Sequence, residues 1–388
     1  MPALDTAPAT LSAPRADLLT SFAATVFGYL PRSDQRRCAN AYLRGLLTVR
    51  GKKTIRQIAR ASGVSDAAPQ ALQQFISASP WDWTTAREVL AQEAAAGLAG
   101  PVWTMGVTVT EKRGDHSVGV HRRAAPESGR TLNCQVGIGL FLTSGSRSVP
   151  VDWQLLLPEG WLTDERRRSR ARIPGWAAEQ PAWVSALDSA DQLGPWIPRR
   201  TPLVADLSVG VDPARLAAQL TARRRDFVIE VRPSQLVAAH RADSDEFTEA
   251  RQLLRCAGLR HPHSLGSDHL EPGRGTLVRS ALVRLPGGGS AGHGGQRVHR
   301  LLAGFLPTRR RPHRYWITSL VDHRIADIVS LPHRAVLTHG AIRTLENDYG
   351  LRDFEGRSFP GWHHHMTLAS AAYVYDHLRP DSPDRQAA

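Results

Sequence analysis

Two carboxylates stand where a catalytic fold places functional groups. Asp206 closes the apolar run "TPLVADLSVG" just before an expected helix, and Glu346 lies on the expected helix "AIRTLENDYG". In α/β sheets, functional groups gather where strands end and the chain turns into a helix. If both carboxylates point into one cleft, they could share divalent metal ions for in-line phosphoryl chemistry. Spacing alone leaves two ordinary alternatives open: Asp206 as an N-cap and Glu346 on a solvated helix face.

The strand that would carry a further carboxylate has none. The stretch "WTMGVTVT" from Trp103 to Thr110 alternates β-branched residues, a pattern typical of a strand that enters the core. In many metal-dependent nucleases the first catalytic carboxylate sits on such a strand. The nearest acidic residues, Glu111 and Asp115, are expected in the turn beyond it. Each extra residue moves a carboxylate by several ångströms, so these two are poor replacements.

The elements before this strand are expected to be helical. The segment "GKKTIRQIARASGVSDAAPQALQQFIS" resembles a helix-turn-helix, with a helix from Thr54, a turn at Gly63 and a second helix from Asp66. Basic residues near its entry are Lys52, Lys53, Arg56 and Arg60, where phosphate contacts are easily made. The alternative is an ordinary helical bundle with a solvated basic face.

The later pattern predicts an α/β fold. Strands are expected between residues 102 and 157, followed by a helix, the short strand before Asp206, another helix and the strand "DFVIEVRP". This β-β-β-α-β-α order is that of ribonuclease-H-like folds with a mixed sheet. The expected organisation is a disordered lead-in over 1–20, a DNA-binding helical domain over 21–98, a ribonuclease-H-like domain over 99–232 and 313–378, an insertion domain over 233–312 and a tail over 379–388.

Charge and cysteine content narrow the class of protein. The net charge is +13 and all but three of the 49 Lys and Arg residues are arginine, which favours a polyanionic partner such as nucleic acid over a merely basic surface. Cys38, Cys134 and Cys256 are too widely spaced for a metal pair or a disulfide framework, as suits a reducing cytosol. No apolar run is long enough to span a membrane.

Blocks along most of the chain resemble the DDE-type transposases of bacterial insertion sequences. These blocks are "AYLRGLLTVRGKKTIRQIA", "LQQFISASPWDW", "HSVGVHRR", "NCQVGIGLFL", "LLLPEGWLTDERRRSRARIP", "ADLSVG" and "TLENDYGLRDFEGRSFPGWHHHMTLASAAYVY". The resemblance implies a ribonuclease-H-like fold with an insertion before the last catalytic residue. It also implies double-stranded DNA as substrate, Mg²⁺ or Mn²⁺ as cofactor and a nucleoid-associated place in the bacterial cytoplasm. Such a protein could form a homodimer.

Catalytic roles carry over only where residues match. Asp206 matches the second metal-binding Asp and Glu346 the last acidic residue. The family motif "V-D-D-T-G-F-P-K-K-G", anchored on "HSVGV", falls on Met105 to Gly114, so Gly106 and Val107 replace both aspartates. A second departure follows Glu346, because the family has several more residues between "DY" and "GL". The helix that carries Glu346 is therefore expected to be shortened relative to that of the family.

Further basic side chains in the matching blocks are candidates for DNA contact. Adjacent histidines on a helix point about 100° apart, so the run His363–His365 cannot chelate one ion from one face and takes a structural or DNA-facing role. The expected DNA-binding residues outside the helical domain are Arg166, Arg167, Arg357 and His364.

The leading hypothesis is a transposase-derived protein that keeps the fold and DNA binding but has lost, or nearly lost, strand transfer. It would be a decaying insertion-sequence remnant or a domesticated DNA-binding protein. One alternative is an active metal-dependent transposase with a relocated carboxylate, Glu111 or Asp115. Another is an old cleft co-opted for small-molecule enzyme chemistry, with Asp206, Glu346, Asp152, His116 and the three adjacent histidines as its titratable groups.

Overall fold

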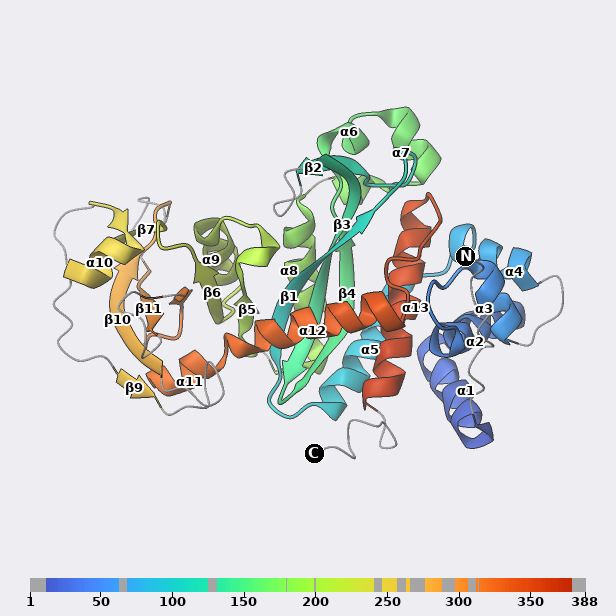
Figure 1. The fold of residues 1–388 in the computed structure, drawn as a ribbon, viewed down its shortest axis with the longest axis horizontal. Helices are drawn as coiled ribbons and strands as arrows, with labels where there is room; N and C mark the ends of the chain where they lie inside the picture. The colour runs from blue at the N-terminus through green and yellow to red at the C-terminus, as the bar shows by residue number, and fades with distance from the viewer. Residues whose placement is uncertain are drawn as a thin grey trace, which may run out of the picture. The chain divides into compact units, whose positions relative to one another are not determined.

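The fold is mixed α/β with a large mixed sheet, consistent with the expected ribonuclease-H-like class. The computed structural model in Figure 1 describes residues 12–62, 68–124, 131–178, 180–198, 200–240, 246–256, 263–265, 276–287, 297–305, 312 and 314–378. The chain divides into two compact units, the first from 1–99, 107–197 and 339–388, the second from 100–106 and 198–338. Strand β1 (Val102–Glu111) and helix α12 (His333–Asp348) each contribute residues to both units.

The first unit begins with helices. They are α1 (Ala13–Phe27), α2 (Ser33–Thr48), α3 (Ile55–Ser62), α4 (Ala68–Ser77) and α5 (Trp83–Gly97). The expected helix-turn-helix corresponds to α3 and α4, while its turn at Gly63 lies outside the described residues. Helix α3 packs against both α2 and α4. The predicted pair of helices is therefore confirmed in outline.

The start of α1 corrects the expected lead-in. Residues 1–20 were expected to be disordered, but α1 begins at Ala13. Pro14 fits the first turn of a helix, where a missing N–H costs nothing. Leu19 is fully buried together with Phe22 and Val26, which lie on the same helix face. The helix therefore begins before Ser21, because its buried apolar face already includes Leu19. Residues 1–11 and the expected tail over 379–388 lie outside the described residues.

The sheet of the first unit is built around one long strand. Strand β3 (Thr131–Ser144) pairs antiparallel with β2 (His121–Ala124) near its start and with β4 (Arg147–Leu155) along the rest. From Cys134 onward β3 is buried, and the apolar run from Val136 to Leu142 accounts for most of this stretch. Gly137 is required there, because a Cβ atom would lie 2.9 Å from the Trp362 ring. The elements that follow are α6 (Glu159–Leu162), α7 (Glu165–Ala171), η1 (Gly175–Ala178), α8 (Ala182–Gln192) and η2 (Gly194–Trp196).

Helix α13 (Phe359–Leu378) is the central helix of this unit. It packs against β4, α5, α2 and α4, and Figure 1 shows it in red beside α5 and α2. Every residue from Phe359 to Tyr375 except Pro360 is buried. A helix buried on all sides must carry apolar or small residues around its whole circumference. Its polar side chains, including three adjacent histidines, must therefore find partners inside the protein.

The second unit has its own part of the sheet. Strands β5 (Leu203–Ala205) and β6 (Phe227–Val231) pair in parallel, and β1 pairs in parallel with the other edge of β5. The order continues from β6 through β12 (Arg314–Thr318), β11 (His299–Phe305), β10 (Thr276–Arg284) and β7 (Leu236–Ala239) to β8 (Thr248–Glu249), with β9 (His263–Leu265) on β10. The other elements are η3 (Leu207–Val209), α9 (Pro213–Ala222), α10 (Ala250–Cys256) and α11 (Ile325–Ser330).

The compact units differ from the expected domains. Strands β10 and β11 fall in the expected insertion of 233–312, yet they continue the sheet of β6 and β12 through antiparallel pairs. Val228, Leu302 and Trp316 from these strands share one buried core cluster. The division into a ribonuclease-H-like domain and an insertion stays a prediction.

Candidate functional site

Asp206 lies where the sequence placed it, directly after a parallel strand. Strand β5 ends at Ala205, and the backbone turns at once into η3. The Asp206 carboxylate accepts hydrogen bonds from the Ser208 backbone N–H at 2.9 Å and from the Ser208 hydroxyl at 2.5 Å. Asp206 therefore acts as the N-cap of η3, which was the ordinary alternative for this residue.

Glu346 is not on a solvated helix face. Its side chain is 13% exposed, and its Oε1 atom accepts a hydrogen bond of 2.6 Å from the Thr108 hydroxyl of β1. The Arg352 guanidinium lies 3.6 Å from the other oxygen, Oε2. Helix α12 ends two residues after Glu346, and the chain turns back with Gly350 at φ +65°, a conformation that favours glycine. This turn at Gly350 brings Arg352 to Glu346.

The side-chain period of β1 shows which position faces this carboxylate. Successive residues of a strand point to opposite faces, so Gly106 shares a face with Thr108 and Val107 lies on the other. A side chain at position 106 would therefore lie on the same face of β1 as Thr108, the residue that donates to Glu346. Glu111, expected in the turn, is instead the last residue of β1. Because it is odd-numbered, Glu111 belongs to the face of β1 opposite Thr108. It is therefore a poor replacement for the first catalytic carboxylate of the family.

The second possible replacement, Asp115, is engaged elsewhere. It lies in the loop after β1, and its side chain is 66% exposed. The Arg167 guanidinium is 3.5 Å from its carboxylate and the His116 ring is 3.4 Å away. The same Arg167 lies over the Trp161 ring at 4.6 Å, so a cation fixed on an aromatic face holds Asp115.

Segments far apart in the sequence meet around residues 352–358, here called the 352–358 segment. The Val118 N–H donates to the Arg357 carbonyl at 3.3 Å, and the Lys112 ammonium donates to the Phe354 carbonyl at 2.6 Å. Lys52 forms an ion pair of 2.8 Å with Glu355. The first unit thus brings together basic side chains from the helical region, from the loop after β1 and from the C-terminal block.

The candidate DNA-binding residues fall into two groups. Lys52, Arg56, Arg60, Arg166 and Arg357 are exposed, and Arg167 is half-buried. Lys53 and His364 are buried, which corrects their expected roles in DNA contact. Lys53 is 4% exposed because its ammonium donates to the Val49 carbonyl inside the unit.

Lys112 also lies in this region, although it is not among the DNA-binding residues expected from the sequence. Burial lowers the pKa of its ammonium to about 8, against the opposite effect of the Asp353 and Glu355 carboxylates. The sequence could have identified Lys112, because it matches a lysine of the family motif that follows the strand.

The three adjacent histidines have structural roles. His364 stacks on Trp81 with ring centroids 3.9 Å apart, and its two ring nitrogens lie 2.8 and 2.9 Å from the Ile76 and Trp81 carbonyls. Burial lowers the pKa of His364, and these two carbonyl acceptors oppose that shift because they favour a doubly protonated ring. His363 contacts Arg87 at 3.2 Å and stacks on Trp83. The rings therefore point to different partners, as expected from their helical spacing.

His365 provides a pH-dependent part of the stability. Its Nδ1 atom is 3.0 Å from the Tyr42 hydroxyl and its Nε2 atom is 2.9 Å from the Gly350 carbonyl, which suits a neutral ring that accepts from the tyrosine and donates to the carbonyl. Burial lowers the pKa of His365 to about 4, whereas the unfolded ring titrates near 6.5. Between these values the unfolded chain binds more protons than the folded chain, so stability falls as pH falls.

We expect the free energy of unfolding to drop between pH 6.5 and pH 4, with His365 contributing on the order of 3 kcal/mol to the drop. In His365→Gln, this part of the pH dependence disappears, although the variant is less stable at pH 7. Urea titrations followed by tryptophan fluorescence at several pH values measure the effect. His323→Gln, at an exposed position, is the matched control. An unchanged pH slope in His365→Gln contradicts the assignment.

The fold indicates the class of protein. A mixed α/β fold with a large mixed sheet, in which β1, β5 and β6 pair in parallel, is consistent with the ribonuclease-H-like class. The chain belongs to the DDE superfamily endonuclease family, whose family model matches residues 25–277. The family acts on DNA and generally uses divalent metal ions. The match includes β1 and Asp206 and ends before Glu346. No curated protein matched the chain.

The residues around Glu346 fit a two-metal centre poorly. Such a centre needs several carboxylates to hold both ions, but the Glu346 carboxylate is already paired with a threonine hydroxyl and an arginine guanidinium. On β1, position 106 is glycine, and Glu111 lies on the opposite face. Among the described residues, no group of three or more His, Cys, Asp or Glu side chains could hold a metal ion. Within the same residues, no helix is long and apolar enough to cross a membrane.

Proposed function

We propose that this protein keeps the DNA-binding role of its family and has lost, or nearly lost, metal-dependent strand cleavage and transfer. It is then an insertion-sequence derivative, either decaying or domesticated as a DNA-binding protein. One observation carries this proposal: the Glu346 carboxylate is already bound by the Thr108 hydroxyl and the Arg352 guanidinium. On β1, position 106, which shares a face with Thr108, is a glycine and has no carboxylate.

The loss of chemistry follows from electrostatics. Carboxylates in a two-metal site hold the ions that stabilise the attacking and leaving oxygens. A guanidinium beside Glu346 places a positive charge where a metal ion would have to bind, and the two cations repel each other. Removing one preorganised electrostatic group typically costs about 10²–10³ in rate. This chain has glycine at position 106, where the family has its first catalytic carboxylate, and it has the Arg352 guanidinium beside Glu346, which matches the last one.

DNA binding is supported by the exposed basic side chains of the first unit. Helix α3 presents Arg56 and Arg60 to solvent, and the 352–358 segment adds Arg357 beside the ion-paired Lys52. Phosphate contacts of this kind give affinity without sequence specificity and release counterions. The expected partner is double-stranded DNA, bound in a salt-dependent way.

We expect the double variant Arg56→Ala/Arg60→Ala to bind duplex DNA about tenfold more weakly. The slope of log K against log salt should become shallower by roughly two, because each lost phosphate contact removes about 0.9 from it. Fluorescence anisotropy with a labelled duplex, measured between low and physiological salt, gives both numbers.

The matched control is the double variant Arg215→Ala/Arg324→Ala, which removes two exposed arginines from the second unit. This control should keep both the affinity and the slope. If the unmodified chain shows no salt-dependent DNA binding, the DNA-binding part of the proposal fails. Equal weakening in both double variants would mean that net charge, and not α3, determines the affinity.

A further inference from the structure

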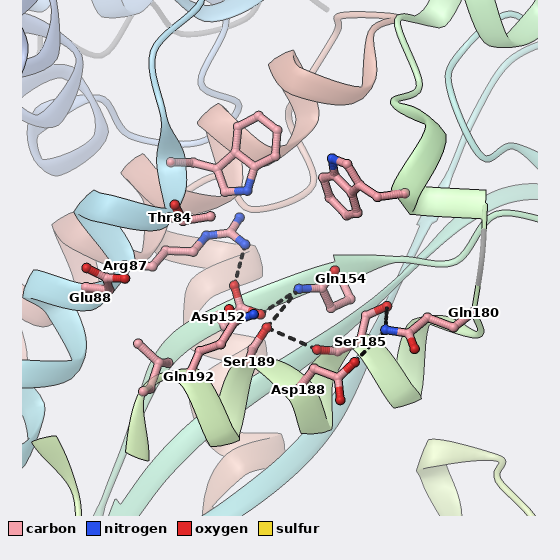
Figure 2. Close-up of a pocket in the computed structure, with 13 residues that line it drawn as sticks. Thr84, Arg87, Glu88, Asp152, Gln154, Gln180, Ser185, Asp188, Ser189 and Gln192 are labelled. Carbon is pink, nitrogen blue, oxygen red and sulfur yellow. Dashed lines mark hydrogen bonds and ion pairs between the residues drawn. The ribbon is translucent and has the colours of Figure 1, made fainter. Parts of the chain in front are cut away.

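Two pockets of the first unit differ in what their linings leave for a ligand. Figure 2 shows the smaller one, of about 270 Å³, where Arg87 reaches to Asp152. The Gln154 amide nitrogen donates there to Asp152 at 2.7 Å and to Ser189 at 3.2 Å, so polar side chains of this lining bind one another. The larger pocket has a volume of about 560 Å³. Small-molecule sites typically measure about 300–1,000 Å³, and of these two pockets the larger one falls in that range.

The larger pocket, here called the α2–α4 pocket, is lined by two helices that pack against each other in the first unit. Its lining comes from residues 29–32 between α1 and α2, from Gln35 and Cys38 on α2, from Phe75 and its neighbours on α4, and from residues 78–82 between α4 and α5. Helix α4 is the second helix of the expected helix-turn-helix. A ligand in this pocket therefore contacts both α2 and α4.

Aromatic rings form a fixed part of the wall. Phe75 and Trp81 stack with ring centroids 5.4 Å apart and planes 12° apart. The Trp81 N–H donates to the Phe75 carbonyl at 3.1 Å, and Trp81 also stacks on His364 at 3.9 Å. Tyr29 is 36% exposed, and its hydroxyl donates to the Asp82 carbonyl. These rings are therefore held in place before a ligand binds, and such rings favour a further aromatic ring at centroid distances of about 4.5–7 Å.

The charged side chains of this lining are paired within the protein. The Arg32 guanidinium donates two hydrogen bonds to the Asp34 carboxylate, at 3.0 and 2.6 Å. The Asp82 carboxylate caps α5, where it accepts from the Thr84 N–H at 2.8 Å and from the Thr84 hydroxyl at 2.6 Å. Burial raises the pKa of the Cys38 thiol, so this side chain stays uncharged at neutral pH. Because burying an unpaired charge is costly, the lining suits an uncharged ligand.

Gln35 adds a polar requirement to this wall. Its amide nitrogen donates to the Ser79 hydroxyl at 2.8 Å, whereas its Oε1 atom is buried and has no hydrogen-bond partner among the described residues. Turning the amide over would exchange oxygen and nitrogen and leave the other atom without a partner. Buried polar atoms of this kind are uncommon in folded proteins. An N–H or O–H group of a ligand in this pocket would supply a donor for Oε1.

We propose that the α2–α4 pocket binds an uncharged aromatic molecule that carries one N–H or O–H donor. Its ring lies against Phe75 and Tyr29, and its donor forms a hydrogen bond with Oε1 of Gln35. An anion such as a phosphate gains little here, because the Arg32 guanidinium is already bound to Asp34. The inference depends on neither the DNA binding nor the lost cleavage chemistry proposed above.

The test is calorimetric titration of the intact chain with indole, which combines an uncharged aromatic ring system with one N–H donor. The ligand control is 1-methylindole, which has the same rings without that donor. We expect indole to bind saturably and 1-methylindole to bind about fivefold more weakly, because the lost hydrogen bond leaves Oε1 of Gln35 without a partner. Gln35→Met should weaken indole binding by about the same factor and should not weaken binding of 1-methylindole.

Ala71→Trp and Gln70→Trp form a matched pair on α4. Both replace exposed residues, but of the two only Ala71 lines the pocket. Ala71→Trp should weaken indole binding by at least about tenfold, because the large side chain clashes with the ligand. Gln70→Trp should bind indole like the unmodified chain, and circular dichroism checks that all variants are folded. Absence of saturable indole binding, equal binding of the two ligands, or equal loss in the two tryptophan variants overturns the proposal.

Alkylation of Cys38 locates the ligand without any substitution. Cys38 is half-buried and lines the pocket, whereas Cys134 is buried on β3. Saturating indole should slow the reaction of Cys38 with N-ethylmaleimide about fivefold, because the ligand restricts access to the thiol, and should leave Cys134 unaffected. Peptide mass mapping measures both rates. An unchanged rate at Cys38 while indole binds places the ligand elsewhere and overturns the proposal, and tighter binding of adenosine than of indole overturns it in favour of a nucleobase.

Discussion

The purified chain, incubated with duplex DNA and Mn²⁺ or Mg²⁺, should show no metal-dependent strand cleavage above the level of Asp206→Asn/Glu346→Gln. The physical reason is the glycine at position 106 of β1, on the face of Thr108, together with the Arg352 guanidinium 3.6 Å from Glu346. Each lost electrostatic group costs about 10²–10³ in rate, so two independent defects of this kind reduce the rate by about 10⁴-fold or more. The cleavage rate is measured as nicking of a supercoiled plasmid that carries the DNA flanking the gene.

The double variant serves as the inactive reference, because it removes both acidic residues that match the family. Asp212→Asn is the matched control, since Asp212 is an exposed carboxylate of the same unit as Asp206 and acts only as the N-cap of α9. Nicking by the unmodified chain that requires Mn²⁺ and disappears in Asp206→Asn would contradict the proposal. That result would identify an active enzyme with a relocated carboxylate, and Glu111→Gln and Asp115→Asn would then show which residue replaced it.

The sequence predicted the positions of the acidic residues better than their surroundings. Asp206 and Glu346 were located from strand-end and helix patterns, and the structure places them after β5 and on α12. The partners of Glu346 were not predictable in this way, because Thr108 is 238 residues away in the sequence and contacts it only through the fold. Arg352 is close in the sequence, but its approach depends on the turn at Gly350.

Burial was the property that sequence patterns predicted least well. Lys52 and Lys53 are adjacent and chemically alike, yet one is exposed and ion-paired while the other is buried against Val49. The sequence offers His364 as a candidate for DNA contact because it lies in a block that matches the family, together with the basic residue Arg357. Its helix is buried on all sides, so the ring lies between Ile76 and Trp81 carbonyls instead. Which face of an element is covered depends on tertiary packing, which short-range periodicity does not record.

The buried pair of Arg87 and Asp152 should dominate the stability of the first unit. Asp152→Ala leaves the Arg87 guanidinium buried without its carboxylate, with only the Trp153 and His363 carbonyls, the His363 ring and the Thr367 hydroxyl as partners. Removing one partner of a buried ion pair costs about 3–5 kcal/mol, mainly because the remaining charge is uncompensated. We therefore expect Asp152→Ala to lower the free energy of unfolding by that amount in urea titrations followed by tryptophan fluorescence.

Two further variants separate this charge effect from a simple loss of packing. Asp191→Ala removes an exposed carboxylate at the end of α8 and should change stability by less than about 0.5 kcal/mol. The double variant Arg87→Met/Asp152→Leu replaces the pair with apolar side chains of similar size, and it should recover most of the loss. If Asp152→Ala costs less than about 1 kcal/mol, or if the double variant is less stable than Asp152→Ala, an uncompensated buried charge is not the cause.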